Sequence, residues 1–139
     1  EQLKKFPSFI ERRRHNWARL HKALECLEDK VILPEPAEGS NPSWFGFLIS
    51  IRPESGLNRN EVTKYVEAHN VQTRLLFSGN LIKHPCFDPI RGTDAYRVAG
   101  DLSATDFIMN NTFWVGVYPG MTDDMIDYMA NVIIAACNA

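Results

Sequence analysis

The chain has 139 residues, a length that suits one domain able to bury its own core. Hydrophobic residues make up 45% and charged residues 23%, a composition that excludes disordered and membrane-embedded classes of protein. The formal net charge of -2 provides no overall field that would favour nucleic acid or an anionic membrane. We therefore expect a globular domain that does not act on nucleic acid or at a membrane.

The cysteines indicate a reducing compartment. Cys26, Cys86 and Cys137 are odd in number and lack the spacing of a zinc site, so free thiols and a cytoplasmic location are expected. We also expect no membrane span and no signal peptide. The sequence opens on Glu1 without an initiator methionine, which indicates a piece of a longer protein.

The first element is a predicted helix from Ser8 to Glu28. Ser8 followed by Glu11 has the form of a capping box, and the cluster Arg12-Arg13-Arg14 is expected to form a solvated face. The apolar positions that recur at helical spacing are Ile10, Trp17, Leu20, Leu24 and Leu27.

Three later segments predict strands because they are dense in β-branched and aromatic residues: Ser43 to Ile51, Val71 to Phe77 and Thr112 to Tyr118. The first is predicted to be central. Alternation puts Trp44, Gly46 and Leu48 on one of its faces and Phe45, Phe47, Ile49 and Ile51 on the other. Gly46 between two phenylalanines suggests a bulge or the close approach of another group. Val31 to Leu33 is a further short extended piece.

Helices are predicted between and after these strands, at Arg59 to His69, at Ser103 to Met109 and from Thr122 onward. Asn70 is a plausible left-handed stop, and Thr122 is the expected cap of the last helix. The apolar face of that helix is formed by Met125, Ile126, Met129, Ile133 and Ala136. Pro85 to Ala99 reads as a long excursion, with at most a short strand at Tyr96 to Ala99.

This order of elements predicts an α+β domain, with a small, mainly antiparallel, three-stranded sheet and helices on one face. A helix between the first two strands permits a split βαβ arrangement in which the third strand is inserted antiparallel between them.

In one stretch, Val71 to Cys86, a predicted strand is followed by a polar turn. Arg74 lies in the apolar run, Ser78-Gly79-Asn80 forms a turn, and His84 follows. Arginine presents five donors in a fork that suits carboxylate or phosphate. The sequence is equally compatible with a strand that has one solvent-facing arginine and an ordinary turn, without a binding role. The sequence lacks the motifs of a nucleophile elbow, a phosphate loop or a zinc helix, and Asp123-Asp124 is better explained as helix capping.

Three strings resemble the C-terminal part of the DegT/DnrJ/EryC family of sugar aminotransferases, and within it the nucleotide-sugar 3-dehydratase branch: GSNPSWFGFLISI, TRLLFSGNLIKHP and YRVAGDLSATDFIMNNTFWVGVYPGMT. The resemblance covers nearly the whole chain. It implies that residues 1–139 form the small C-terminal domain of the aspartate-aminotransferase fold (fold type I). The long helix, residues 1–28, would then lead from a large domain upstream.

The resemblance also implies a function for the longer protein. It would remove the 3-hydroxyl of CDP-4-keto-6-deoxyglucose in lipopolysaccharide O-antigen biosynthesis, using pyridoxamine or pyridoxal phosphate and a two-iron, two-sulfur cluster. A reductase partner and a homodimer are expected for that protein. Catalytic, cofactor and metal-binding residues would lie upstream, so this chain alone is expected to hold no cofactor and to be inactive. The alternatives are the small domain of a sugar aminotransferase and a non-catalytic ligand-binding or dimerisation module.

The resemblance places several substrate-binding candidates in this chain. Phe45 stands where aminotransferases of the family carry the His of a YHLF strand, and an apolar ring there fits an enzyme that excludes water, although Phe45 could simply be core. Arg74 matches the TR of the family segment IxTRxHYxPLH, but Leu76 and Phe77 replace its His-Tyr pair. The full set of candidates is Phe45, Arg74, Ser78, Asn80, His84 and Asn111, with Asn110 as a weaker neighbour.

Overall fold

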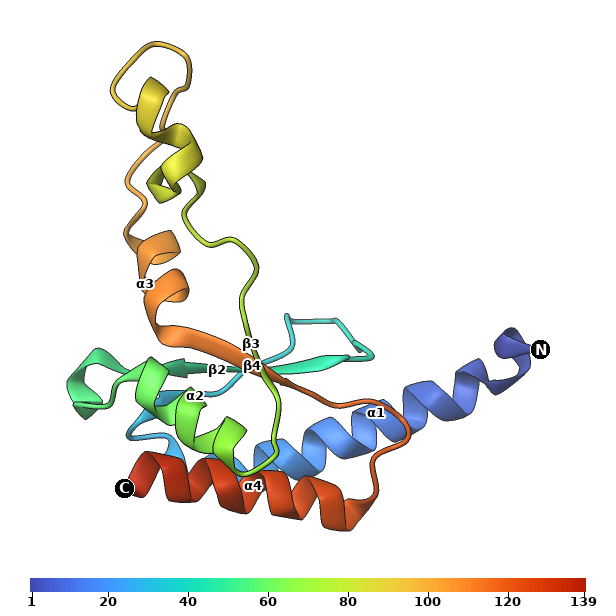
Figure 1. Cartoon of the computed structure of the whole chain (residues 1–139). Helices are drawn as coiled ribbons and strands as arrows, with labels where there is room; N and C mark the ends of the chain where they lie inside the picture. The colour runs from blue at the N-terminus through green and yellow to red at the C-terminus, as the bar shows by residue number, and fades with distance from the viewer.

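Four antiparallel strands form one sheet in the computed structural model, which describes residues 1–139 (Figure 1). They are β1 (Val31–Ile32), β2 (Gly46–Ile51), β3 (Thr73–Leu75) and β4 (Thr112–Gly116), in the order β1-β2-β4-β3. Strand β4 pairs antiparallel with both β2 and β3, which is the split βαβ arrangement that the sequence permits. The α+β class is confirmed. The expected strand number was wrong, because the two-residue β1 is too short to show alternation.

The helices are α1 (Gln2–Leu24), α2 (Arg59–Ala68), α3 (Ser103–Asn111) and α4 (Asp123–Asn138). Helices α1, α2 and α4 lie on one side of the sheet (Figure 1). Short 3-10 turns occur at Glu25–Leu27, Pro53–Ser55, Leu81–Lys83 and Pro85–Ile90. None of the helices is both long and apolar enough to span a membrane.

The core lies between the sheet and these helices. Phe47, Ile49 and Ile51 of β2 alternate with outward residues and have no exposed surface, as do Phe113 and Val115 of β4. They pack in one hydrophobic cluster with fully buried residues of the helices, among them Leu20, Leu24, Ile126 and Ile133. Burying each such side chain contributes about 1.5–3 kcal/mol, so this layer is what stabilises the fold.

Helix α1 differs from its predicted form. It begins at Gln2, and Ser8 is no cap, because its hydroxyl donates to the carbonyl of Lys5 within the helix. The predicted solvated face was also wrong. Arg12 donates to the carbonyl of Met121, and Arg14 donates to the carbonyls of residues 41 and 42. These carbonyls come close only after folding, so the local pattern could not predict the contacts.

Strand β2 begins three residues later than expected, and the predicted alternation fails before Gly46. Trp44 turns toward the helices and stacks on Trp17, with 5.7 Å between ring centroids. Phe45 turns to the opposite face, where it meets Trp114 edge-on at 5.2 Å. Both assignments to a face were therefore wrong. The close approach predicted at Gly46 is confirmed, because the ring of Trp114 lies against it.

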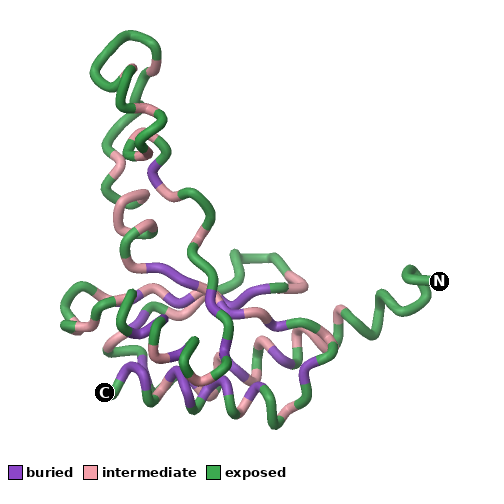
Figure 2. The backbone as a smooth tube through the Cα atoms, in the orientation of Figure 1, coloured by how far each residue is buried: buried purple, intermediate pink, exposed green.

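Residues 77–102, here named the arm, rise from the sheet on the side opposite α1 and α4 (Figure 1). Most of the arm is exposed (Figure 2). The predicted long excursion forms no strand at Tyr96 to Ala99, where no neighbouring strand lies to pair with it. Strand β3 is also shorter than predicted, and the chain leaves it through Phe77, whose φ is +50°. Asn70 has a φ of +61°, which confirms the left-handed stop after α2.

Candidate functional site

A groove of about 570 Å³ opens at the edge of the sheet, between the start of β3, the end of β4 and the first turns of α4. Its volume falls within the range of small-molecule sites, about 300–1,000 Å³. Aromatic and methionine residues make up half of the lining residues, which also include one cation, Arg74, and one anion, Asp124. The aromatic and methionine residues of the lining are Trp114, Tyr118, Met121, Met125, Tyr128 and Met129.

Arg74 lies opposite Trp114 in the register of β3 and β4. Its side chain is exposed, and it makes no hydrogen bond or ion pair with any residue of the chain. The guanidinium is therefore free to bind a carboxylate or a phosphate in the groove.

Trp114 connects the groove to the face of the sheet opposite α1, α2 and α4 (Figure 1). Its indole N–H donates to the carbonyl of Leu75 at 3.2 Å, which fixes the ring across the β3–β4 pair. The ring of Phe45 contacts Trp114, and 59% of Phe45 is exposed. Phe45 is thus no core residue but part of an aromatic surface beside Arg74.

Three other predicted candidates lie together at the base of the arm. Asn80 is almost fully buried, and its side-chain amide donates to Asp106 at 2.8 Å. Ser78 is exposed, and its carbonyl contacts the Nε2 atom of His84. None of the three lines the groove. The structure therefore divides the candidates between two places.

Asp106 of α3 holds the base of the arm. It accepts from Lys83 at 2.7 Å as well as from Asn80, and these hydrogen bonds, with that from Lys83 the stronger influence, lower the pKa of its carboxyl group. Gly79 has a φ of +64° and packs directly against Met109, where a Cβ would overlap the methionine side chain. The turn thus needs glycine both for its backbone angle and for this contact.

Asn111 lies at the end of α3, next to β4. Its side-chain amide donates to the carbonyl of Phe107 at 3.0 Å, inside the same helix, while Asn110 is exposed. Trp114, Tyr118 and Asp124 were not among the candidates derived from the sequence. Trp114, Gly116 and Tyr118 follow one another at a spacing of two, and that alternation in TFWVGVY was the available signal.

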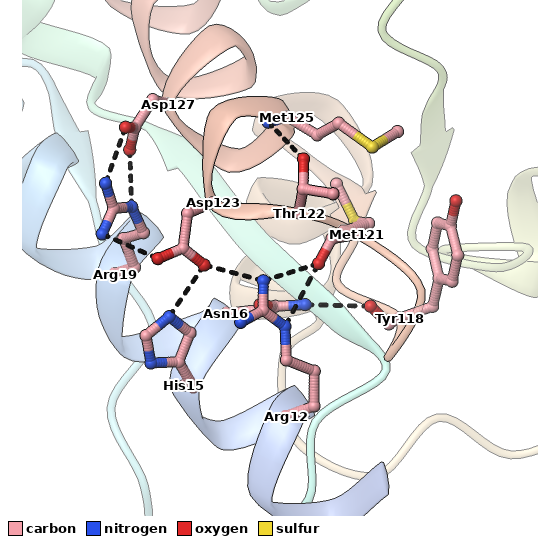
Figure 3. A network of polar contacts seen from close by, with 10 residues as sticks. All are labelled: Arg12, His15, Asn16, Arg19, Tyr118, Met121, Thr122, Asp123, Met125 and Asp127. Atoms are coloured by element: carbon pink, nitrogen blue, oxygen red, sulfur yellow. Dashed lines mark hydrogen bonds and ion pairs between the residues drawn. The ribbon is translucent and has the colours of Figure 1, made fainter.

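A polar cluster joins α1 to the start of α4 (Figure 3). Asp123 accepts from Arg12 at 2.7 Å and from Arg19 at 3.2 Å, and it contacts His15. The hydrogen bond from Arg12, followed by that from His15, lowers the pKa of the Asp123 carboxyl group. Thr122 accepts from the backbone N–H of Met125, which confirms the predicted cap.

The residues of this chain do not fit the cofactors that the resemblance implies. No group of three or more His, Cys, Asp or Glu side chains could hold a metal ion, which rules out a complete set of cluster ligands here. No lysine lines the groove, so the chain offers no amine there for a Schiff base.

The fold and this groove define an α+β domain with one face covered by helices and the other face open and aromatic. The model of the DegT/DnrJ/EryC1/StrS aminotransferase family matches residues 1–134, and the chain belongs to this family. The family resemblance read from the sequence is thereby confirmed.

Two curated relatives and one solved structure are similar to this chain along nearly its whole length. Lipopolysaccharide biosynthesis protein RfbH of Salmonella typhimurium is 44% identical over 130 residues, which are 94% of this chain and 29% of that protein. The dTDP-4-dehydro-2,6-dideoxy-D-glucose 3-dehydratase of Saccharopolyspora spinosa is 45% identical over 132 residues, 95% of this chain and 28% of that protein. The E. coli GDP-4-keto-6-deoxy-D-mannose-3-dehydratase with bound hydrated PLP has a TM-score of 0.81 at 26% identity, covering 95% of this chain and 32% of that one. The chain thus spans less than a third of each protein.

Proposed function

We propose that this chain is the small C-terminal domain of a cytoplasmic nucleotide-sugar 3-dehydratase that depends on pyridoxamine or pyridoxal phosphate. The substrate would be CDP-4-keto-6-deoxyglucose, which loses its 3-hydroxyl on the route to an O-antigen dideoxysugar. The observation that carries this proposal is the 44% and 45% identity, along nearly the whole chain, with RfbH and with a second sugar 3-dehydratase.

The domain would form one wall of the active-site cleft. Arg74, free in the groove, would bind the diphosphate of the nucleotide sugar through charge-assisted hydrogen bonds. Phe45 and Trp114 would cover the sugar with an apolar surface that keeps water out. Binding energy from the nucleotide end would then position the sugar carbon that reacts.

The base of the arm would contribute in two ways. The buried amide of Asn80 is engaged with Asp106, so its proposed role is to hold the arm in place beside the substrate. Ser78 is exposed and His84, which contacts its carbonyl, is half-buried, and both would contact the nucleotide sugar directly. Asn111 would support the junction between α3 and β4.

The cofactors would belong to the large domain upstream. Pyridoxamine phosphate, when bound there, supplies an electron sink for breaking the bond between C-3 and oxygen. We place the two-iron, two-sulfur cluster, the surface for a reductase partner and the homodimer interface in the whole protein as well.

Product analysis with the whole protein tests the proposal. Incubation with CDP-4-keto-6-deoxyglucose, pyridoxamine phosphate, glutamate and a reducing system should give a 3-deoxy sugar by mass spectrometry, and this chain alone should give none. If the product has instead gained nitrogen from glutamate and kept every hydroxyl, the protein is the aminotransferase alternative. Turnover by the isolated chain would also overturn the proposal.

A further inference from the structure

Two side chains of α1 bind backbone carbonyls in the turn that connects β4 to α4. Arg12 donates to the carbonyl of Met121 through Nη2 at 2.7 Å and through Nε at 3.2 Å. Asn16, which has no exposed surface, donates to the carbonyl of Tyr118 at 2.9 Å. The segment that contains these carbonyls, Tyr118 to Thr122, is named the wall turn.

The wall turn has little hydrogen bonding of its own. Within it, the backbone N–H of Met121 donates to the carbonyl of Tyr118 at 3.2 Å. The carbonyls of Tyr118 and Met121 are also the acceptors for α1, so the first and the fourth residue of the turn are tied to that helix, while Thr122 at its end accepts from α4. Buried backbone carbonyls need hydrogen-bond partners, and α1 supplies them for these two carbonyls of the turn.

Helix α1 also binds Asp123, the residue that follows the wall turn. The guanidinium of Arg12 is shared between the carbonyl of Met121 and the carboxylate of Asp123, with Nη2 at 2.7 Å from an oxygen of each. Arg19 donates to Asp123 and Asp127 in the first turns of α4. Because the guanidinium is planar and rigid, Arg12 fixes the carbonyl and the carboxylate relative to each other.

The side chains of this region form one wall of the groove. Tyr118 and Met121 belong to the wall turn, and Asp124 and Met125 belong to the first turn of α4, and all four line the groove. In Figure 3, Tyr118 and Met125 lie on the side of the turn away from Arg19. The carbonyls thus contact α1 while the side chains shape the groove.

We propose that helix α1 sets the position of this wall of the groove, with Arg12 and Asn16 as positioning residues. A displacement of α1 would carry the two carbonyls with it and move Tyr118 and Met125. By linkage, a ligand that fills the groove would in turn favour one position of α1. This coupling does not depend on which reaction the whole protein carries out.

The methionines provide a direct test. Three of the four methionines, Met121, Met125 and Met129, line the groove, while Met109 lies in α3 at the base of the arm and serves as an internal reference. In chain labelled with 13C-methyl methionine, Arg12→Gln should shift the methyl signals of Met121 and Met125 and leave Met109 in place.

Arg14→Gln is the matched control, because Arg14 lies on the same helix and also binds backbone carbonyls, but those of Asn41 and Pro42. It should move the groove methyls less than Arg12→Gln does. Arg12→Lys keeps the positive charge but loses the planar set of donors, so the methyl signals should shift less and in the same direction. If circular dichroism shows that Arg12→Gln does not fold, Arg12→Lys is the variant in which the methyl signals are compared. A Met125 signal that moves no more in the Arg12 variants than in Arg14→Gln would overturn the proposal.

Discussion

The indole of Trp114 lies against the backbone of Gly46, so closely that a Cβ on residue 46 would come within 2.7 Å of its Cε3 atom. The two residues are diagonal neighbours on the sheet, since Gly46 pairs with Gly116 and Trp114 pairs with Leu48. Glycine at this position lets the indole lie flat on β2, where Phe45 contacts it. The aromatic surface beside the groove thus depends on one missing side chain.

Replacing Gly46 with alanine should therefore displace the indole. We expect Gly46→Ala to lower the free energy of unfolding by about 1–3 kcal/mol, the usual cost of inserting a group into a packed position. Urea unfolding measures this. The matched control is Gly116→Ala, because a Cβ on the paired glycine would meet nothing within 4 Å. Equal losses in the two variants would contradict the role of the indole contact.

Arg74 is the residue proposed to bind the diphosphate. In the whole protein, Arg74→Ala should raise the Michaelis constant for the CDP-sugar by an amount equivalent to about 1.5–3 kcal/mol, because a charge-assisted hydrogen bond is lost. Lys64→Ala, which removes an exposed cation on α2 that does not line the groove, should leave the constant unchanged. Unchanged kinetics in the Arg74 variant would remove this residue from the site.

The arm should exchange its amide hydrogens quickly in the isolated chain. Residues 83–100 are mostly exposed and contain only short 3-10 turns, whereas Phe113, Val115 and Val117 are fully buried. Mass spectrometry of peptides after hydrogen exchange should show rapid labelling of the arm and slow labelling of 113–117. Equally slow exchange in both segments would show that the arm is held more firmly than its exposure indicates.

Acid should release the base of the arm. Because Lys83 and then Asn80 lower the pKa of Asp106, the stabilisation from this carboxylate is present above its ordinary pKa of about 3.9 and is lost as pH falls through the lowered value. The side-chain amide signals of Asn80 in NMR spectra should therefore titrate with a midpoint below about 3.9. In Asp106→Asn the titration should disappear. Its persistence there would assign it to another group.

The three cysteines should differ in reactivity. Burial raises the pKa of the Cys137 thiol to about 11, so it stays protonated at neutral pH, whereas Cys26 and Cys86 are exposed. Because the thiolate is the reactive form, a thiol reagent should modify two cysteines in the folded chain and all three after denaturation. Intact mass measurement counts the modified groups. Rapid modification of Cys137 in the folded chain would show that its surroundings open readily.

The main elements of the fold could be predicted because their signals are local. Phe47, Ile49 and Ile51 alternate along β2, and Thr122 caps α4 within one turn of the helix. These patterns involve residues a few positions apart, so they are visible in the sequence without any knowledge of the tertiary structure. The same holds for the strings that carry the family resemblance, and for Arg74 as a candidate.

Contacts between distant parts of the chain had no such signal. The groove joins residues 70–74, 114–121 and 124–129, and the Arg12 contact with Met121 spans 109 residues. Whether Phe45 points into the core or toward Trp114 depended on where β2 begins, and that was set by pairing with β4. Sequence by itself determined the class, the family and most of the elements of this protein. Only the tertiary structure decided which side chains share a surface, because chain folding brings together residues that no local pattern relates.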